Sequence, residues 1–212
     1  MRVENWGQID YELAVQLQLD LVERVASGEE DVLVFCTHPP IVTKGRATTA
    51  EDITGWQGPT FESSRGGRAT YHGPNQIVIY PIIDLRLNRR GIGERDVHAY
   101  LRAVERAVVA ALKSLGIEGA EARTTKVGEV SMTGVWVGAG KIASLGIAVR
   151  KWVTYHGVAI NLEEDSLAFQ GIRPCGFSAN VMTSLQKECG QMVSRADCLS
   201  ALEKSFKREL SL

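Results

Sequence analysis

The sequence predicts an α+β fold, in which a mixed, mostly antiparallel sheet is flanked by helices. Helical periodicities occur near the start, in the middle and at the end of the chain, and strand-like segments fill the two intervals between them. A doubly wound sheet would instead alternate strands and helices one by one. Arg65-Gly66-Gly67 does not extend into G-x-G-x-x-G, and no G-x-x-x-x-G-K-[ST] loop is present.

Length and composition favour one domain over residues 1–212. The chain is 44% apolar and 23% charged, as is usual for a soluble globular protein. Its net charge of −1 argues against a general nucleic-acid binder. The first ten residues contain no apolar leader, and no apolar run is long enough for a bilayer. We therefore expect a cytoplasmic protein without membrane contact.

Cysteine spacing argues against a metal site. The four cysteines are scattered, without a C-x-x-C pair, so we expect no zinc and free, reduced thiols. Cys36 ends an apolar strand and is best interpreted as a core thiol.

The first third of the chain reads as a helix and two strands. Asp10 is placed to cap a helix that starts at Tyr11, carries apolar residues at helical spacing and closes at Gly28. The apolar run 32–36 predicts a buried strand, and 41–43 a second, short one. The polar segment 47–60 is loop-like and contains nothing that indicates catalysis.

A Gly-rich segment, residues 65–76, leads into an apolar strand, residues 77–80. Glycine permits close approach of backbone to a ligand, and histidine suits proton transfer near neutral pH, so His72 is a candidate site residue. The basic loop 86–95 follows, and it is either a solvated connector or a surface for an acidic partner.

The second half predicts a long helix from Glu94 to Gly116, an irregular segment over 117–131 and then strands. Residues 134–137 and 141–149 form a hairpin around a Gly-Ala-Gly turn, and 152–162 form the next strand. Small residues in these strands leave room for a ligand.

Strict alternation along the last strand places His156 on one face with Thr154 and Val158. His156 is then best interpreted as a satisfied core histidine. A final helix is capped by Ser194 and continues to Leu210.

Two further residues are candidates for chemistry. Cys175 lies between proline and glycine, where a nucleophile is accessible, and a thiolate requires a nearby cation. Lys141 is a candidate for that cation, although spacing alone favours a solvated hairpin lysine. Spacing does not show that the two meet.

Four motifs together resemble the lipoyl(octanoyl) transferase family. They are Arg65-Gly66-Gly67-x-x-Thr70-Tyr71-His72-Gly73-Pro74-x-Gln76, the segment from Thr133 to Gly146, the segment from Trp152 to Leu162, and Pro174-Cys175-Gly176 followed by Thr183-Ser184-Leu185. The similarity extends to Thr43-Lys44-Gly45-Arg46 and covers most of the chain in order.

The resemblance implies an acyltransferase that works through a cysteine thioester, without a cofactor or metal. Cys175 would be the nucleophile, and Lys141 would activate it and shuttle protons. The substrate would contact residues in three groups: Arg65, Gly66, Gly67, Arg68, Ala69, Thr70, Tyr71 and His72; Ser144, Leu145 and Gly146; Gly157, Val158 and Ala159. Backbone amides near Gly66-Gly67 or in 144–146 would bind the oxyanion.

The resemblance also implies partners and a fold. The donor would be octanoyl-acyl carrier protein, and the acceptors would be lipoyl domains of 2-oxoacid dehydrogenase complexes and the glycine cleavage H protein. The fold would be similar to the catalytic domains of lipoate and biotin protein ligases, and the protein a monomer. One departure lies in the first motif, where Asn75 replaces the family's usual glycine.

Four alternatives stay open at this point. They are an ATP-dependent lipoate or biotin ligase, a lipoyl amidotransferase acting between lipoyl domains, a non-catalytic module that binds carrier protein, and a papain-like hydrolase. The first lacks visible adenylate-binding motifs. The last lacks a local signature, and Cys175 follows every histidine in the chain.

Overall fold

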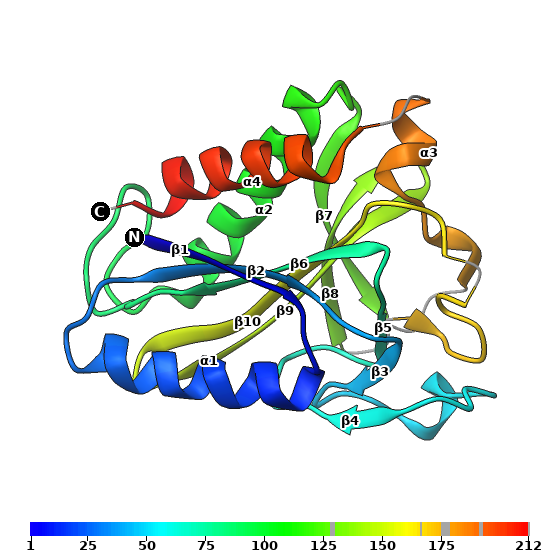
Figure 1. Cartoon of the computed structure of the whole chain (residues 1–212), viewed down its shortest axis with the longest axis horizontal. Coiled ribbons are helices and arrows are strands. Elements are labelled where there is room, and N and C mark those ends of the chain that lie inside the picture. Colours follow the sequence, from blue (N-terminus) through cyan, green and yellow to red (C-terminus); the bar gives the residue numbers. More distant parts are fainter. Residues whose placement is uncertain (128–129, 166, 175–178, 191–192, 212) are drawn as a thin grey trace.

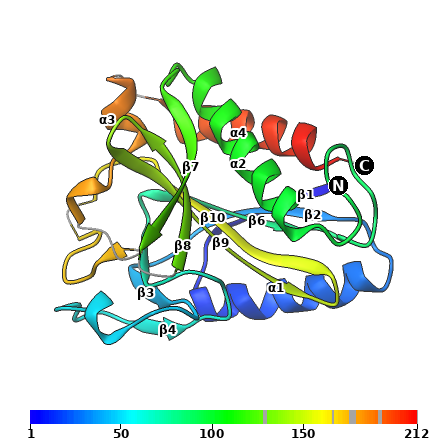
Figure 2. The same cartoon turned by 180° about the vertical axis from the view of Figure 1, so that it is seen from behind.

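The main sheet lies between two layers of helices. The computed structural model describes residues 1–127, 130–165, 167–174, 179–190 and 193–211. Helix α1 (Tyr11–Ala26) covers one face of the sheet, and α2 (Val97–Ser114) and α4 (Arg195–Leu210) cover the other (Figures 1 and 2). Among the helices that the structure describes, none is both long and apolar enough to span a bilayer.

Seven strands form the main sheet, in the order β1 (Arg2–Gln8), β2 (Val32–Thr37), β6 (Gln76–Ile82), β10 (Val153–Asn161), β9 (Gly140–Arg150), β8 (Val130–Val137) and β7 (Ala120–Val127). Strands β1 and β2 are parallel, and the other neighbours are antiparallel. The prediction of an α+β fold with a mixed, mostly antiparallel sheet is confirmed.

Burial on both faces explains why β2 and β6 read as continuous apolar runs. Leu33 and Phe35 of β2 pack toward α2 and α4, whereas Val34 and Cys36 pack toward α1. Cys36 is therefore a core thiol, as predicted, and burial raises its pKa.

Predicted caps define two of the helices. The Asp10 carboxylate accepts the N–H groups of Glu12 and Leu13 at the start of α1, and Ser194 caps α4. Helix α2 begins at Val97 behind Asp96, slightly later than the Glu94 start that the sequence suggested.

A smaller sheet lies at one end of the main one (Figure 1). Its order is β4 (Thr60–Glu62), β3 (Ile41–Lys44) and β5 (Thr70–His72). Strand β5 runs through a turn, in which the Gln76 N–H donates to the Gly73 carbonyl at 3.2 Å, directly into β6. The Gly-rich segment thus connects the two sheets.

Most of the described part of segment 117–131 is strand, contrary to the irregular structure that we predicted. Residues from Ala120 pair with β8 up to a Val127–Val130 pair, which forms an edge hairpin. Exposed polar residues such as Glu121 mask the two-residue period of an edge strand. The same reason explains why the parallel edge strand β1 gave no signal in the sequence.

The basic loop 86–95 serves as a connector. Arg89 is buried, contacts Asp31 at 2.6 Å and donates to the Leu210 carbonyl at 3.0 Å, which ties the loop to the end of α4. Arg86 is paired with Asp84 at 2.6 Å. Both arginines are bound by groups of the protein itself. This favours a connecting loop over a surface that binds an acidic partner.

The ladder between β6 and β10 is interrupted in its middle. Regular pairing covers Val158–Ile79 to Asn161–Gln76, and a single bridge reappears at Val153–Asp84. Pro81 lies in this gap and has no N–H to donate. Its carbonyl accepts instead from the Thr154 hydroxyl at 2.6 Å. Opposite Pro81, His156 has a left-handed backbone with φ of 57°.

Gly157 is required where the two strands approach closely beside this gap. A Cβ atom at Gly157 would lie 2.1 Å from the Ile79 carbonyl oxygen and 2.9 Å from Pro81 Cδ. We predict that Gly157→Ala destabilises the protein by about 3 kcal/mol, because buried backbone has to move. Chemical denaturation measures the change.

Gly119→Ala is the matched control, since its Cβ would be 3.7 Å from Val137 Cγ1, an ordinary contact. This variant should unfold like the wild type. Equal stability of Gly157→Ala and Gly119→Ala would contradict the close approach.

Candidate functional site

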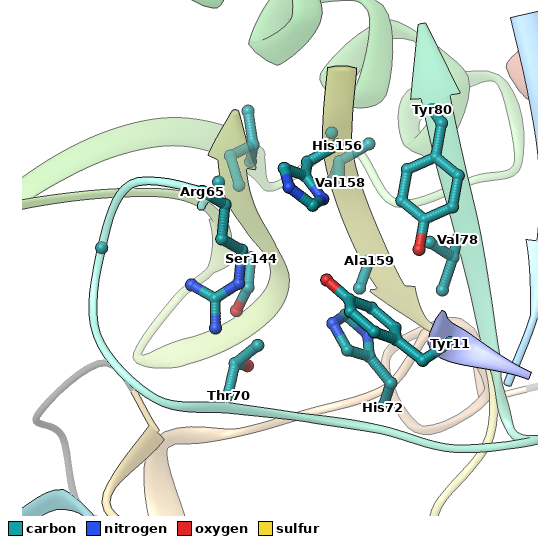
Figure 3. Close-up of a pocket in the computed structure, with 14 residues that line it drawn as sticks. Tyr11, Arg65, Thr70, His72, Val78, Tyr80, Ser144, His156, Val158 and Ala159 are labelled. Carbon is teal, nitrogen blue, oxygen red and sulfur yellow. The ribbon is translucent and has the colours of Figure 1, made fainter. Parts of the chain in front are cut away.

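A cavity that is partly open to solvent lies between the Gly-rich segment and strands β9 and β10 (Figure 3). Ten residues predicted from the sequence line it: Arg65, Gly67, Thr70, His72, Ser144, Leu145, Gly146, Gly157, Val158 and Ala159. Four more of the described residues line it: Tyr11, Val78, Tyr80 and His156. Three motifs that lie far apart in the sequence therefore contribute residues to one cavity: the Gly-rich segment, β9 and β10.

Arg65 shapes the loop over the cavity. Its side chain is buried and donates to the carbonyls of Gly66 and Arg68 at 3.0 and 2.9 Å and to the Thr43 carbonyl at 2.8 Å. The guanidinium therefore curls the loop around itself and fastens it to β3. It also places a buried positive charge beside the cavity, while no carboxylate is among the described lining residues.

The predicted oxyanion amide of Gly66 is already engaged, because its N–H donates to the Ile147 carbonyl at 3.0 Å. This contact lays the loop across β9. Gly146 lies beneath it, and a Cβ there would be 3.1 Å from Arg65 Cδ. Small residues in β9 thus admit the loop as well as a ligand.

One end of the cavity is closed by aromatic rings. Tyr11 stacks on His72 with ring centroids 5.5 Å apart, and His38 meets His72 edge-on. His38 Nδ1 is 2.8 Å from the Ile9 carbonyl, so Nδ1 carries the proton. Nε2 then accepts from the Tyr80 hydroxyl at 2.7 Å. His38 therefore supports the cavity wall from behind.

Side-chain amides fix the tautomer of His72. Gln76 Nε2 donates to Asn161 Oδ1 at 2.9 Å and to the Tyr71 carbonyl, so Gln76 Oε1 is free to accept. It accepts a hydrogen bond from His72 Nδ1–H at 3.3 Å, so Nε2 carries the lone pair. Burial, followed by His38 and Arg65, holds the pKa of His72 well below its usual value.

His156 turns to the face opposite to the one that alternation predicted. Its ring centroid is 4.7 Å from that of Tyr155, and the Ser64 hydroxyl lies 3.0 Å from the Tyr155 hydroxyl and 3.1 Å from His156 Nε2. Neighbouring residues share a face only because the left-handed φ of His156 breaks the alternation. The predicted placement with Thr154 and Val158 is wrong.

His156 is also not fully satisfied. It is 2% exposed, and Nδ1 has no hydrogen-bond partner within the described part of the chain. Burial, and then the charge of Arg65, lowers the pKa of His156 to about 3. The imidazole is therefore a neutral, buried part of the cavity wall.

Lys141 is buried, contrary to the solvated lysine that spacing favoured. Its side chain is 1% exposed and lies over Gly134, where a Cβ would be 2.5 Å from Lys141 Cε. Nζ is 6.0 Å from the centroid of the Trp136 ring. Lys141 precedes Ser144, a lining residue of the cavity, by three residues on β9.

Cys175 lies outside the described residues, but the chain is anchored on both sides of it. Before it, the Arg173 N–H donates to the Asp52 carbonyl at 2.8 Å. Asp52 ends the 3₁₀ helix Ala50–Asp52 of segment 47–60, so this loop holds the chain next to Cys175. After it, the Thr183 N–H donates to the Lys141 carbonyl at 3.0 Å.

Four predicted substrate residues do not line the cavity. Gly66 lines a groove outside it, and Tyr71 donates to Asp165 at 2.8 Å. Arg68 pairs with Asp52 at 2.6 Å, and Ala69 is buried in the small core beside β3. Their contact with substrate stays a prediction.

Asn75 fits its position without strain, since it is not among the described residues with positive φ. Its side-chain amide donates to the Glu164 carbonyl at 3.2 Å. The departure from glycine therefore adds a contact between the turn before β6 and the segment after β10.

Comparison of the whole chain with known proteins shows its family. The chain matches the model of the family described as lipoyl protein ligase A/B catalytic domain over residues 10–207. It is 50% identical over 196 residues to an octanoyltransferase of Bdellovibrio bacteriovorus, which covers 90% of each chain. The chain belongs to the octanoyltransferase family. An octanoyltransferase of Geobacter metallireducens is 37% identical over 198 residues, covering 93% of this chain and 87% of the relative.

Solved structures show the same fold outside the octanoyltransferases. A lipoate-protein ligase A bound with ATP superposes with a TM-score of 0.77 at 19% identity, over 99% of this chain and 85% of the ligase. A biotin protein ligase from Aquifex aeolicus gives 0.51 at 10% identity, over 99% and 69%. At these identities the likeness concerns the fold alone, and the predicted similarity to ligase domains is confirmed.

Sequence reasoning missed Tyr11, Val78 and Tyr80 as wall residues of this octanoyltransferase. Tyr11 fits the apolar stripe of α1, and Val78 and Tyr80 fit a buried strand. For the two tyrosines, the one available signal was an aromatic residue with a hydroxyl on a segment that otherwise carries aliphatic residues, and Val78 gave no signal.

Because three buried histidines are neutral in the folded protein, we predict that the protein loses stability in acid. Burial lowers the folded-state pKa of His38, His72 and His156, so below pH 6.5 the unfolded chain binds more protons. Stability is therefore lost as the pH falls. From pH 7.5 to 5.5 we expect about 3 kcal/mol less by chemical denaturation, roughly 1.4 each from His72 and His156.

Two variants isolate the histidine contribution. His156→Asn should reduce the acid loss by about 1.4 kcal/mol, because one buried neutral histidine is gone. His98→Gln, on the exposed side of α2, should leave it unchanged. A loss of equal size in both variants would show that other groups cause it.

Proposed function

We propose that this octanoyltransferase moves an octanoyl group from acyl carrier protein to a lysine of lipoyl domains through a thioester on Cys175. The observation that supports it most is the apolar, carboxylate-free cavity, walled by the residues of three family motifs in the described structure. The acceptors would belong to 2-oxoacid dehydrogenase complexes and the glycine cleavage H protein. Residues 1–212 would act as one catalytic domain, as a cytoplasmic monomer.

In the first step, the Cys175 thiolate attacks the carbonyl carbon of the octanoyl thioester. The bond from that carbon to the phosphopantetheine sulfur breaks, and the departing thiolate takes a proton from Lys141. In the second step, the acceptor amine attacks the new thioester, gives its proton back to Lys141 and releases Cys175. Thioester exchange is nearly isoenergetic and aminolysis runs downhill, so ATP is not required.

The described residues suit the two ends of this substrate. Val78, Val158 and Ala159 offer aliphatic surface to the chain, and burying it contributes about 5 kcal/mol at ~0.8 per CH₂ group. Near the loop, the buried charge of Arg65 favours the developing oxyanion electrostatically. The N–H groups of Arg65 are hydrogen-bonded to the loop and to Thr43. Arg65 would therefore act on the oxyanion through its positive charge and by shaping the loop.

Incubation with octanoyl-acyl carrier protein, without ATP, tests the thioester. We expect a hydroxylamine-labile octanoyl adduct on Cys175, detected by mass, and none in Cys175→Ala. Cys36→Ala and Cys198→Ala are matched controls, because both thiols are buried and should leave the adduct intact. An adduct that survives Cys175→Ala, or one that forms only with ATP, would overturn the proposal.

Lys141→Met, which keeps the bulk of the buried side chain, tests the proton shuttle. We expect kcat/KM to fall by roughly 10²–10⁴, the usual contribution of a general acid–base group. The rising limb of the pH–rate profile should move to higher pH, since the thiolate loses a nearby cation. Lys151→Met, on the exposed turn before β10, is the control. An unmoved profile in Lys141→Met would argue against this role.

A further inference from the structure

Gln18 is a polar residue on the buried face of α1. Its neighbours on that face are apolar, and Gln18 itself is 0% exposed. Its Nε2 donates to the Ala14 carbonyl at 3.2 Å, and its Oε1 accepts the backbone N–H of His156 at 2.7 Å. A carbonyl only accepts and a backbone N–H only donates, so the orientation of this amide is fixed.

The partner of Gln18 lies in the gap of the β6–β10 ladder. Pro81 interrupts the pairing there, and the N–H of His156 points out of the sheet toward α1. A left-handed backbone is unfavourable for a side chain with a Cβ and persists only where the surroundings enforce it. Gln18 supplies the acceptor that this conformation requires.

The conformation decides where the imidazole of His156 lies. An extended residue at this position would point toward α2 with Thr154, whereas the left-handed one lies beside the Tyr155 ring, 4.7 Å between centroids. Figure 3 shows the imidazole projecting into the cavity on the same side as Tyr80 and Ala159. An interruption of a ladder next to a site commonly redirects a side chain in this way.

We propose that Gln18 is a positioning residue for acyl-chain selection: its amide oxygen holds the His156 N–H in the ladder gap and thereby keeps the imidazole as a wall of the acyl cavity. The inference rests on the proposed function for its substrate. Gln18 itself does not touch the cavity. It acts only through His156.

Gln18→Met removes the acceptor and nearly conserves volume. Without the anchored N–H, the imidazole leaves the wall and the cavity lengthens. We expect kcat/KM for decanoyl-acyl carrier protein to rise about tenfold relative to octanoyl-acyl carrier protein, the effect of roughly two further buried CH₂ groups. Gln18→Asn shortens the side chain by one CH₂ group, so the amide oxygen no longer reaches the His156 N–H. It should change the ratio in the same direction, and it replaces Gln18→Met as the test if that variant fails to fold.

A double-mutant cycle separates positioning from general stability. In a His156→Gly background no imidazole remains and the left-handed conformation is unstrained, so Gln18→Met should change the chain-length ratio less than twofold. Val22→Ala, on the same buried face of α1, should lower the melting temperature and leave the ratio unchanged. Equal shifts in both backgrounds, or an equal shift in Val22→Ala, would overturn the proposal.

A second readout does not depend on transfer. In the wild type, an NMR contact between the rings of Tyr155 and His156 is expected, and Gln18→Met should lose it while Val22→Ala retains it. Persistence of that contact in Gln18→Met would refute the positioning role. A wild type that shows the contact but transfers no octanoyl group would refute the proposed function instead.

Discussion

The arrangement of the site depends on the buried guanidinium of Arg65. Its hydrogen bonds close the loop on itself and fasten it to β3, while the Gly66 amide binds the loop to β9. Burial first, and then the charge of Arg65, lower the pKa values of His72 and His156, so both imidazoles are neutral. Arg65 therefore shapes the loop over the cavity and adds a positive charge beside it.

Sequence patterns were sufficient wherever one physical signal dominated. The Asp10 and Ser194 caps, the apolar runs of β2 and β6 and the hairpin before β9 all appear as predicted. The three motif segments that meet at the cavity were also found, because family motifs record a shared site even when spacing does not show contact.

Other features follow from contacts that no local pattern encodes. Burial of Lys141 depends on the space above Gly134, a residue of another strand. The direction of the His156 side chain depends on Pro81 and Gln18, which lie far from His156 in the sequence. Edge strands β1 and β7 are half-exposed, so their polar residues conceal the period of two on which a strand prediction relies.

The origin of the cavity wall links ligand binding to folding. Its described residues come from the first turn of α1, from segment 65–80 and from strands β9 and β10, so the cavity forms only when the chain from α1 to β10 is folded. A bound acyl chain therefore stabilises the whole native state by mass action, by about 2.7 kcal/mol at a hundredfold excess over Kd. Because folding and binding are coupled in this way, resistance to proteolysis would report occupancy of the cavity without any chemical step.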